Sequence, residues 1–240
     1  MNNILFRIML LAHRLVKGIA NRILDKRVIR PRNFSNEMIR RYAPFFEGSA
    51  INISGWRDED GEGNKYKSYF PNVKSYSVSN VSNQRKGLGS AGKEYKEIEI
   101  DLTKDLPHEF FQSFDLVLNH TTLEHIYDFK KAFKNICDLS RDVVIIIVPV
   151  MQQIHQTKDF GDYWRPTTMT VAKMFRENGL EPLVIKCNDQ PFAPVYCFGI
   201  ASRNPIKYEK MFKKDLDFQM GAHNYGSSLD KNGLLTVLDK

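Results

Sequence analysis

Cysteine is scarce in this sequence. The 240 residues include three, Cys137, Cys187 and Cys197, and no two of them have CxxC or zinc-type spacing. Disulfide frameworks and structural zinc sites need paired or clustered cysteines, so the sequence disfavours both. A reducing cytoplasm is the expected compartment.

Long apolar runs are missing as well. A helix that crosses a bilayer needs roughly 20 apolar residues, and the apolar stretch near the N-terminus is interrupted by Arg7 and Arg14. These charges, with no A-x-A-like cleavage site after them, also disfavour a signal peptide. The sequence shows no internal repeat and no low-complexity tract, and its length indicates one domain with appendages.

Acidic residues are rare at the start of the chain. Residues 1–41 contain ten Lys and Arg against two acids, Asp25 and Glu37, whereas the remaining residues contain 25 basic and 26 acidic side chains. The net charge of +7 therefore comes from the N-terminal arm. Because the rest of the chain is nearly neutral, nucleic acid is not an expected partner.

The arm has the periodicity of an amphipathic helix. Its apolar residues recur every three or four positions and form one stripe, at Ile4, Ile8, Leu11, Leu15 and Ile19. Two interpretations remain open: the helix lies on an anionic inner membrane face through residues 4–32, or it packs on its own domain or on a second copy of the chain. The sequence does not predict the oligomeric state.

Strands and helices alternate through the middle of the chain. In Phe114–Asp128, FDLVLNHTTLEHIYD, an apolar strand runs into polar groups, and a helix at 129–139 leads to a second buried strand, Val143–Val150. Three earlier strands and a final antiparallel pair are predicted at 50–55, 75–79, 98–102, 183–186 and 196–201. This order predicts an α/β fold with a Rossmann-like, doubly wound, mostly parallel sheet, a C-terminal antiparallel hairpin and an N-terminal amphipathic helix.

Residues 47–203 are expected to form this domain, after a helical arm of residues 1–46 and before a partly irregular extension of residues 204–240. Ligands of open parallel sheets bind beyond the carboxyl ends of the strands. The polar groups expected at this edge are Asn119, His120, Thr121, Glu124 and His125. A bound small molecule is expected beside them.

Three segments resemble the class I S-adenosylmethionine-dependent methyltransferases, in particular the small methyltransferases of bacterial surface-glycan biosynthesis. They are FDLVLNHTTLEHIYD, VVIIIVPV, and GDYWRPT with the helix TVAKMFRENGLEP. With the first strand included, the resemblance spans about residues 50–201. It implies S-adenosyl-L-methionine as the cofactor, at a site whose assigned residues are Ser54, Gly55, Asn80, Asp101, Asn119 and His120.

The chain departs from this family in its nucleotide loop. Gly55 is the clear match to the family's GxG turn, and Asn80 stands where the family has an acid that binds both ribose hydroxyls. Two explanations are open. Either Asp58, Glu59 or Asp60 takes over the ribose contact, or the cofactor site has decayed and the protein is a non-catalytic binding or scaffold module on the same fold.

Two histidines are candidates for the general base that takes the proton of the methyl acceptor. His125 follows Glu124, whose carboxylate would raise its proton affinity, and His155 lies in the loop after the fifth strand. The alternative for Glu124 and His125 is a helix-start pair that satisfies backbone donors. No metal site is expected from His120, Glu124 and His125, because adjacent residues on a helix point about 100° apart.

The word DYWR, residues 162–165, is typical of a substrate clamp. Arg165 would bind an anionic group of the acceptor, while Tyr163 and Trp164 would stack on a sugar. The alternative is structural, with Asp162 and Arg165 pairing to brace the loop. The residues assigned to substrate binding are Glu124, Asp162, Tyr163, Trp164 and Arg165.

The resemblance and the arm together predict a cytoplasmic enzyme of surface-glycan biosynthesis. It would O-methylate a sugar or sugar-linked phosphate, with a small-molecule or lipid-linked glycan as the acceptor. The basic arm would keep it near the inner membrane face.

Overall fold

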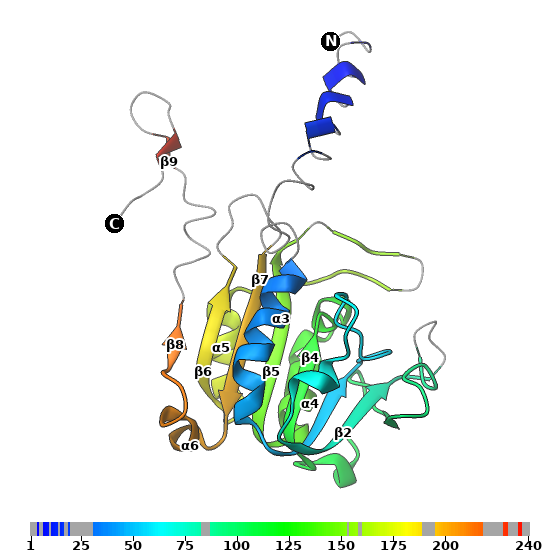
Figure 1. Cartoon of the computed structure of the whole chain (residues 1–240), viewed down its shortest axis with the longest axis vertical. Helices are drawn as coiled ribbons and strands as arrows, with labels where there is room; N and C mark the ends of the chain where they lie inside the picture. The colour runs from blue at the N-terminus through cyan, green and yellow to red at the C-terminus, as the bar shows by residue number, and fades with distance from the viewer. Residues whose placement is uncertain are drawn as a thin grey trace.

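The computed structural model describes residues 31–82, 87–152, 154–157, 160–188 and 195–217, with ten residues between 4 and 19 and two short strands at 228–229 and 235–236. Its main element is an eight-stranded sheet of order β3-β2-β1-β4-β5-β7-β6-β8 (Figure 1). The strands are β1 Gly48–Ile53, β2 Val73–Asn80, β3 Lys96–Glu99, β4 Phe114–His120, β5 Ser140–Met151, β6 Glu181–Cys187, β7 Val195–Ser202 and β8 Asp215–Leu216.

The sheet is parallel from β3 to β5, and β7 runs antiparallel to both of its neighbours. The strand order reverses between β1 and β4, since β1 leads through β2 to β3 on one side while β4 leads to β5 on the other. Open α/β sheets bind ligands at such a switch point. The predicted α/β fold with an antiparallel C-terminal end is confirmed.

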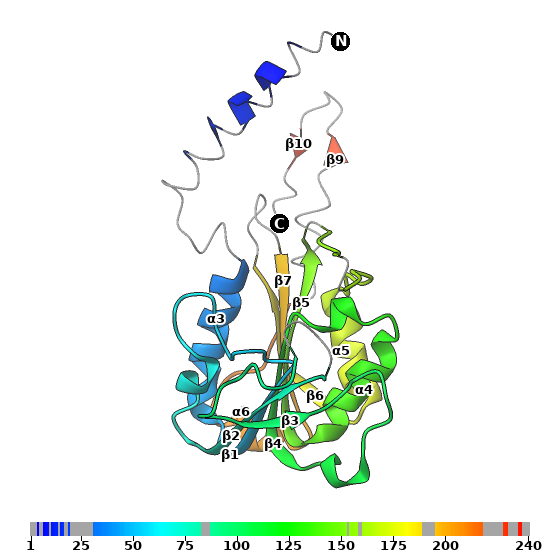
Figure 2. The ribbon, with the colours of Figure 1, turned by 90° about the vertical axis from the view of Figure 1, so that its right-hand side faces the viewer.

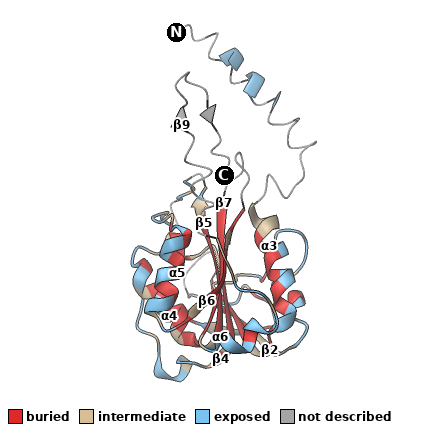
Figure 3. Ribbon diagram, turned by 90° about the vertical axis from the view of Figure 1, so that its left-hand side faces the viewer, coloured by how far each residue is buried: buried red, intermediate tan, exposed pale blue. Residues whose placement is uncertain are grey.

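Helices cover both faces of the sheet. α3 (Pro31–Tyr42) lies on one face, and α4 (Phe129–Leu139) and α5 (Thr168–Glu177) lie on the other (Figure 2). The central strands β4, β5 and β6 are mostly buried between these layers (Figure 3), whereas β3 and β8 at the two edges are not. The two helices that follow β4 and β5 begin at side-chain caps, because Asp128 accepts a hydrogen bond from the backbone of Lys131 and Thr167 accepts one from Thr170.

Segments on both sides of residues 47–203 also pack on the sheet. Met38 and Ile39 of α3 are buried in the core. At the other end, Tyr208 in α6 (Pro205–Glu209) is buried and β8 pairs with β6. These segments are short, and each has too few apolar residues to show a helical or strand periodicity in the sequence.

The described residues of the arm are helical and exposed. All five residues of its apolar stripe are more than half exposed. Within the described chain, every helix is too short or too polar to span a bilayer. The three cysteines lie in the core as free thiols.

Candidate functional site

The turn after β1 has a strained backbone. Ser54, Trp56 and Asp58 have φ angles of 55°, 50° and 60°, a region that residues with a side chain rarely adopt. Gly55 lies among them, and a Cβ atom at this position would come within 2.7 Å of the Asn52 side chain. Strain of this kind persists only where surrounding bonds hold it, and it gathers at ligand sites.

A buried carboxylate, Asp58, holds this turn from inside. Four groups donate hydrogen bonds to it at 2.7–3.0 Å: Asn52 Nδ2, Tyr76 OH, Tyr95 OH and the backbone nitrogen of Lys67. Burial raises the pKa of Asp58, although the four donors act in the opposite direction. Because these donors already satisfy the carboxylate, its position supports the loop rather than a ribose.

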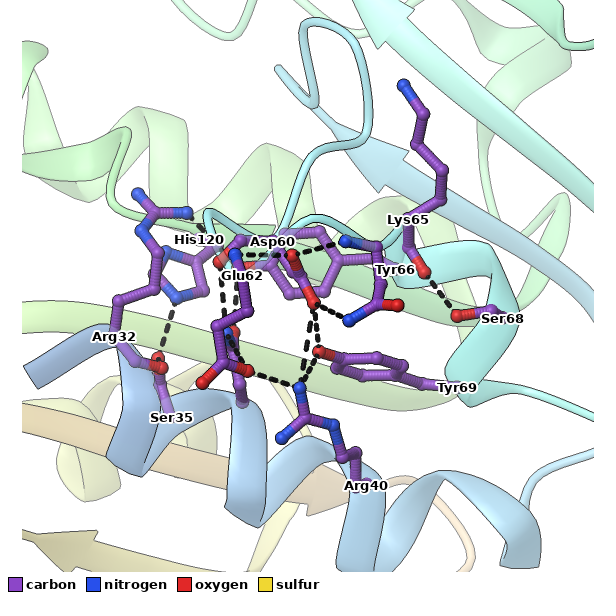
Figure 4. A network of polar contacts seen from close by, with 12 residues as sticks. Arg32, Ser35, Arg40, Asp60, Glu62, Lys65, Tyr66, Ser68, Tyr69 and His120 are labelled. Atoms are coloured by element: carbon purple, nitrogen blue, oxygen red, sulfur yellow. Dashed lines mark hydrogen bonds and ion pairs between the residues drawn. The ribbon is translucent and has the colours of Figure 1, made fainter. Parts of the chain in front are cut away.

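Asp60 plays the same part in the hairpin that follows (Figure 4). It accepts hydrogen bonds from Tyr69 OH at 2.5 Å and from the backbone nitrogens of Glu62 and Asn64, and Arg40 of α3 approaches it at 3.6 Å. Burial acts to raise its pKa, but the hydrogen bonds lower it overall. Of the three acids considered for ribose binding, Glu59 is the one with an exposed carboxylate, and it lies 3.7 Å from Lys65.

Asn80, at the end of β2, is bonded on both sides of its amide. Its Oδ1 accepts a hydrogen bond from the backbone nitrogen of Trp56 at 2.8 Å, and its Nδ2 donates to Trp56 O and to Glu97 Oε1 at 2.6 Å. A ribose contact through Asn80 would have to replace one of these bonds, and it stays a prediction. The contact also brings a carboxylate, Glu97 of β3, to the end of β2.

Asp101 lies in the turn after β3, which ends at Glu99, earlier than predicted. Its Oδ1 accepts hydrogen bonds from the backbone nitrogen and the hydroxyl of Thr103, at 2.9 and 2.7 Å. Lys104 lies 3.4 Å from the other oxygen. The carboxylate remains partly exposed at the sheet edge, and its contact with the cofactor stays a prediction.

β4 ends in two residues that point to different neighbours. Asn119 donates a hydrogen bond from Nδ2 to the carbonyl oxygen of Ile53, at the end of β1. His120 stands between the rings of Tyr66 and Tyr196, and its Nε2 lies 2.8 Å from Ser35 Oγ of α3 (Figure 4). Burial lowers the pKa of His120 well below its usual value, so the ring is a neutral part of the wall.

The loop after β5 is fastened to the turn after β4 by three hydrogen bonds. His125 Nδ1 lies 2.6 Å from the carbonyl oxygen of Gly161, the backbone nitrogen of Tyr163 donates to the carbonyl of Glu124 at 2.7 Å, and Trp164 Nε1 donates to the carbonyl of Tyr127 at 3.1 Å. The two segments therefore form one wall. LEH and DYWR, which are far apart in the sequence, meet in it.

The two candidate bases contact each other edge to face in this wall. The ring centroids of His125 and His155 are 4.9 Å apart and their planes are nearly perpendicular. His125 Nε2 lies 3.8 Å from Glu124 Oε1, and His155 Nδ1 lies 3.2 Å from Asp162 Oδ2. Burial lowers the pKa of His125 and raises the pKa of Glu124 to about 8.

The structure gives Arg165 a bracing contact. Its guanidinium makes two parallel hydrogen bonds to the carboxylate of Asp162, at 2.5 and 2.6 Å, and these bonds lower the pKa of Asp162 to about 2. The pairing agrees with the structural interpretation of DYWR, in which Asp162 and Arg165 brace the loop. A direct anion contact by Arg165 stays a prediction.

Three exposed aromatic side chains, here called the aromatic rim, lie in this wall. Tyr163 is 52% exposed and Trp164 41% exposed, and both rings contact Tyr127, which is 75% exposed. Neither Tyr127 nor Glu97 was expected at the site from the sequence. Tyr127 lies two residues after LEH and could have been assigned, whereas Glu97 is placed there only by the register between β2 and β3.

Buried polar atoms without partners gather at the same edge of the sheet. Among the described residues, four buried side-chain oxygens have no hydrogen-bond partner: Asn119 Oδ1, both oxygens of Glu124, and Gln152 Oε1. Asn119 ends β4, Glu124 lies in the turn after it, and Gln152 follows β5. Buried oxygens in proteins are rarely left unpaired, so this edge has the character of a ligand site.

Comparisons with known proteins support the fold. No family model matches the sequence, and no curated protein sequence matches it. The structure is similar to the 1,6-didemethyltoxoflavin-N1-methyltransferase of Burkholderia thailandensis, with a TM-score of 0.51 and 14% identity over 84% of this chain and 90% of that one. It is also similar to an S-adenosylmethionine-dependent methyltransferase of Mesorhizobium loti, with a TM-score of 0.53 and 13% identity over 70% of this chain and 96% of that one. At these identities the likeness shows a shared methyltransferase-type fold.

Proposed function

We propose that this protein is an S-adenosylmethionine-dependent methyltransferase that methylates an oxygen of a sugar or sugar-linked phosphate in surface-glycan biosynthesis. The observation that carries the proposal is the set of unpartnered buried oxygens at the carboxyl edge of β4 and β5. They lie where a methyltransferase-type fold binds its ligands. The similar Burkholderia structure holds S-adenosylhomocysteine, the demethylated form of that cofactor.

The residues at this edge fit the cofactor. Asn119 Oδ1 needs a hydrogen-bond donor, and the ammonium group of the cofactor's methionine part is one. Asp101 is partly exposed and is assigned to the adenine amino group. Glu97 accepts one hydrogen bond on each oxygen, from Asn80 Nδ2 and from the backbone nitrogen of Gly89, and a second lone pair on each oxygen can accept a ribose hydroxyl. Gly55 lets the turn pack against the side chains of Asn52 and Val78, where a Cβ atom would clash, and its backbone is the part proposed to contact the cofactor.

The chain's own residues would place the acceptor and take its proton. S-adenosylmethionine supplies a methyl group that is already activated on a sulfonium, so no further activation of the donor is needed. His125 and His155 are the proposed proton acceptors. The lowered pKa of His125 keeps its ring neutral near pH 7, which is the form that a base requires.

The aromatic rim is the proposed binding surface for the sugar. Tyr127, Tyr163 and Trp164 present exposed ring faces beside the histidine pair, and such faces stack on the apolar side of sugar rings. Arg165 acts on this surface through Asp162, because the ion pair fixes the loop that carries Tyr163 and Trp164. Glu124 and Asp162 would contribute by holding the two histidines.

The arm supports a location at an anionic membrane. Its apolar stripe is exposed, and residues 1–41 carry ten basic side chains against two acids. A helix with these features binds in the interface plane of a bilayer with its apolar face down. The proposed acceptor is therefore a lipid-linked glycan at the inner face of a membrane, within reach of a cytoplasmic enzyme.

A non-catalytic module is the second candidate. The bonds that hold Asp58, Asp60 and Asn80 favour it, because all three side chains are committed to the loop. Binding of S-adenosylmethionine separates the two candidates.

Isothermal calorimetry of the full chain with S-adenosylmethionine tests the proposal. We expect saturable binding, and we expect Asn119→Leu to weaken it because the replacement removes the oxygen that awaits a donor. Asn72→Ala is the matched control, since Asn72 is exposed and bonds to Pro44 outside the site. Absence of heat at millimolar cofactor would support the non-catalytic module.

A further inference from the structure

Glu124, His125 and His155 form a set of metal-binding groups. One oxygen of Glu124 and one ring nitrogen from each histidine lie within 4.8 Å of one another. Glu124 and His125 come from the short turn η4 (Leu123–His125), and His155 comes from the loop after β5. The turn is not a regular α-helix, and it directs both of its side chains to the same space. His120, which the sequence analysis grouped with them, lies against Ser35 instead.

Glu124 is the group in this set that most needs a partner. It is fully buried, and neither carboxylate oxygen has a hydrogen-bond partner among the described residues. Arg165 does not meet this need, because its guanidinium is bonded to Asp162. Burying a carboxylate costs free energy unless its oxygens are hydrogen-bonded, paired with a cation or bound to a metal.

His125 is oriented as metal-binding histidines are. A carbonyl oxygen can only accept, so the 2.6 Å contact with Gly161 O assigns the ring proton to Nδ1. Nε2 then carries the lone pair, and it lies 3.8 Å from Glu124 Oε1. Histidine ligands commonly donate their second ring nitrogen to a backbone carbonyl in this way, which fixes the tautomer and the direction of the ligand atom.

His155 has the other common support. Its Nδ1 lies 3.2 Å from Asp162 Oδ2, and its backbone nitrogen donates to the same oxygen at 2.9 Å. A carboxylate beside a histidine raises the ligand strength of that ring. With Nδ1 directed to Asp162, Nε2 would be the ligand atom.

We propose that Glu124, His125 and His155 bind a divalent transition-metal ion of the zinc type. Two imidazole nitrogens and one carboxylate oxygen are ligands typical of such ions, whereas magnesium and calcium prefer oxygen alone. Three protein ligands leave a coordination position for a further group. Ligand atoms around zinc lie roughly 3.4 Å apart at metal–ligand distances of about 2.1 Å, so the site contracts when the ion binds.

The catalytic role of the ion deepens the proposed function and rests on it. Binding of the ion at these three residues does not depend on that function. The open position would take the acceptor oxygen, and a metal-bound hydroxyl loses its proton at a lower pH. The proton would pass to solvent, the bound oxygen would bond to the cofactor's methyl carbon as the carbon–sulfur bond breaks, and S-adenosylhomocysteine would leave. With the ion bound, the ion rather than a histidine ring would make the acceptor nucleophilic.

Titration of the chelator-treated full chain with Co²⁺ tests the site, because bound cobalt reports low coordination through its visible ligand-field bands. We expect one saturable Co²⁺ per chain, displaced by Zn²⁺. His125→Ala and His155→Ala should each weaken binding at least ~10-fold, the lower end of the loss caused by changes to groups that only support metal ligands. His108→Ala is the matched control and should bind as the wild type does, since His108 is exposed in η3 (His108–Phe110).

Glu124→Gln keeps the size of the side chain and removes its charge, so it should fold, and it should lose Co²⁺ affinity with an undiminished melting temperature. The proposal is overturned if the wild type shows no saturable bands, or if both histidine variants bind Co²⁺ with wild-type affinity. Calorimetry of the chelator-treated chain with S-adenosylmethionine keeps the two proposals apart. Cobalt binding without cofactor binding would overturn the methyltransferase function and leave the metal site standing.

Discussion

His125 Nδ1 lies 2.6 Å from the carbonyl oxygen of Gly161, and this contact joins the turn after β4 to the loop after β5. It fixes the direction of Nε2 toward Glu124. It also shows how two sequence words separated by α4 and β5 come together in one wall. The position of the proposed base therefore depends on both segments at once.

His125→Asn should lower the rate of methyl transfer and leave cofactor binding intact. General bases contribute roughly 10²–10⁴-fold to rate, so we expect kcat to fall within that range. Transfer of tritium from labelled S-adenosylmethionine to a membrane glycan extract measures the rate, and calorimetry measures the cofactor Kd. His108→Ala is the control. A variant that keeps wild-type kcat would remove His125 from the reaction.

Glu97→Gln should weaken S-adenosylmethionine binding by about 10-fold, because a neutral amide accepts the ribose hydroxyls less strongly than a carboxylate. The matched control is Glu99→Gln on the same strand, whose carboxylate bonds to the backbone of Ser82 and lies in solvent. Calorimetry on both variants gives the comparison. Equal Kd values for the two variants would assign Glu97 to loop support alone.

Asp58→Ala should destabilise the domain by about 3 kcal/mol or more, because it leaves the hydroxyls of Tyr76 and Tyr95 buried without an acceptor. Urea unfolding followed by circular dichroism measures the change. Glu59→Ala, one residue along, removes an exposed carboxylate and should stay within about 0.5 kcal/mol of the wild type. A small effect of Asp58→Ala would mean that the turn after β1 is held by other contacts.

A variant that lacks residues 1–30 should no longer sediment with anionic vesicles. The deletion removes the exposed apolar stripe and leaves α3 intact. Binding of the full chain should also fall with salt, since each basic residue near an anionic surface contributes about 1 kcal/mol and is screened. Vesicles of phosphatidylglycerol, with phosphatidylcholine as the neutral control, give the measurement. Full sedimentation of the shortened variant would falsify the membrane proposal.

Acid should weaken the loop that carries DYWR. The hydrogen bonds from Arg165 lower the pKa of Asp162 to about 2, below the unfolded value of about 3.9. A depressed acid pKa stabilises the folded state above the unfolded value, and this contribution is lost as pH falls from about 4 toward 2. The stability difference between the wild type and Asp162→Asn should therefore shrink over this window. Urea midpoints at several pH values test it, and a constant difference would contradict the assignment.

The central fold could be predicted because its signals are local. Val143–Val150 is apolar throughout, and the segment from Phe114 changes from apolar to polar within one strand, which places a ligand edge. β8 and Tyr208 could not be predicted, since two paired residues and one buried ring leave no period. Their place follows from tertiary pairing with β6.

The candidate site was only partly open to sequence reasoning. LEH and DYWR marked the segments that meet, but the sequence could not show that His125 and His155 contact each other or that Arg165 bonds to Asp162. The acids of the first loop were misleading for a physical reason. In the sequence, Asp58 and Asp60 look like acids that are available to a ligand. In the structure, Tyr95 donates a hydrogen bond to Asp58 and Tyr69 donates one to Asp60, and both acids are held inside the protein.

Ser35, in the second turn of α3, has its Oγ 2.8 Å from His120 Nε2. The contact ties α3, on one face of the sheet, to the carboxyl end of β4. Truncations chosen for crystallisation should therefore stop before Pro31, since cutting at residue 46 would remove α3 and uncover the His120 ring.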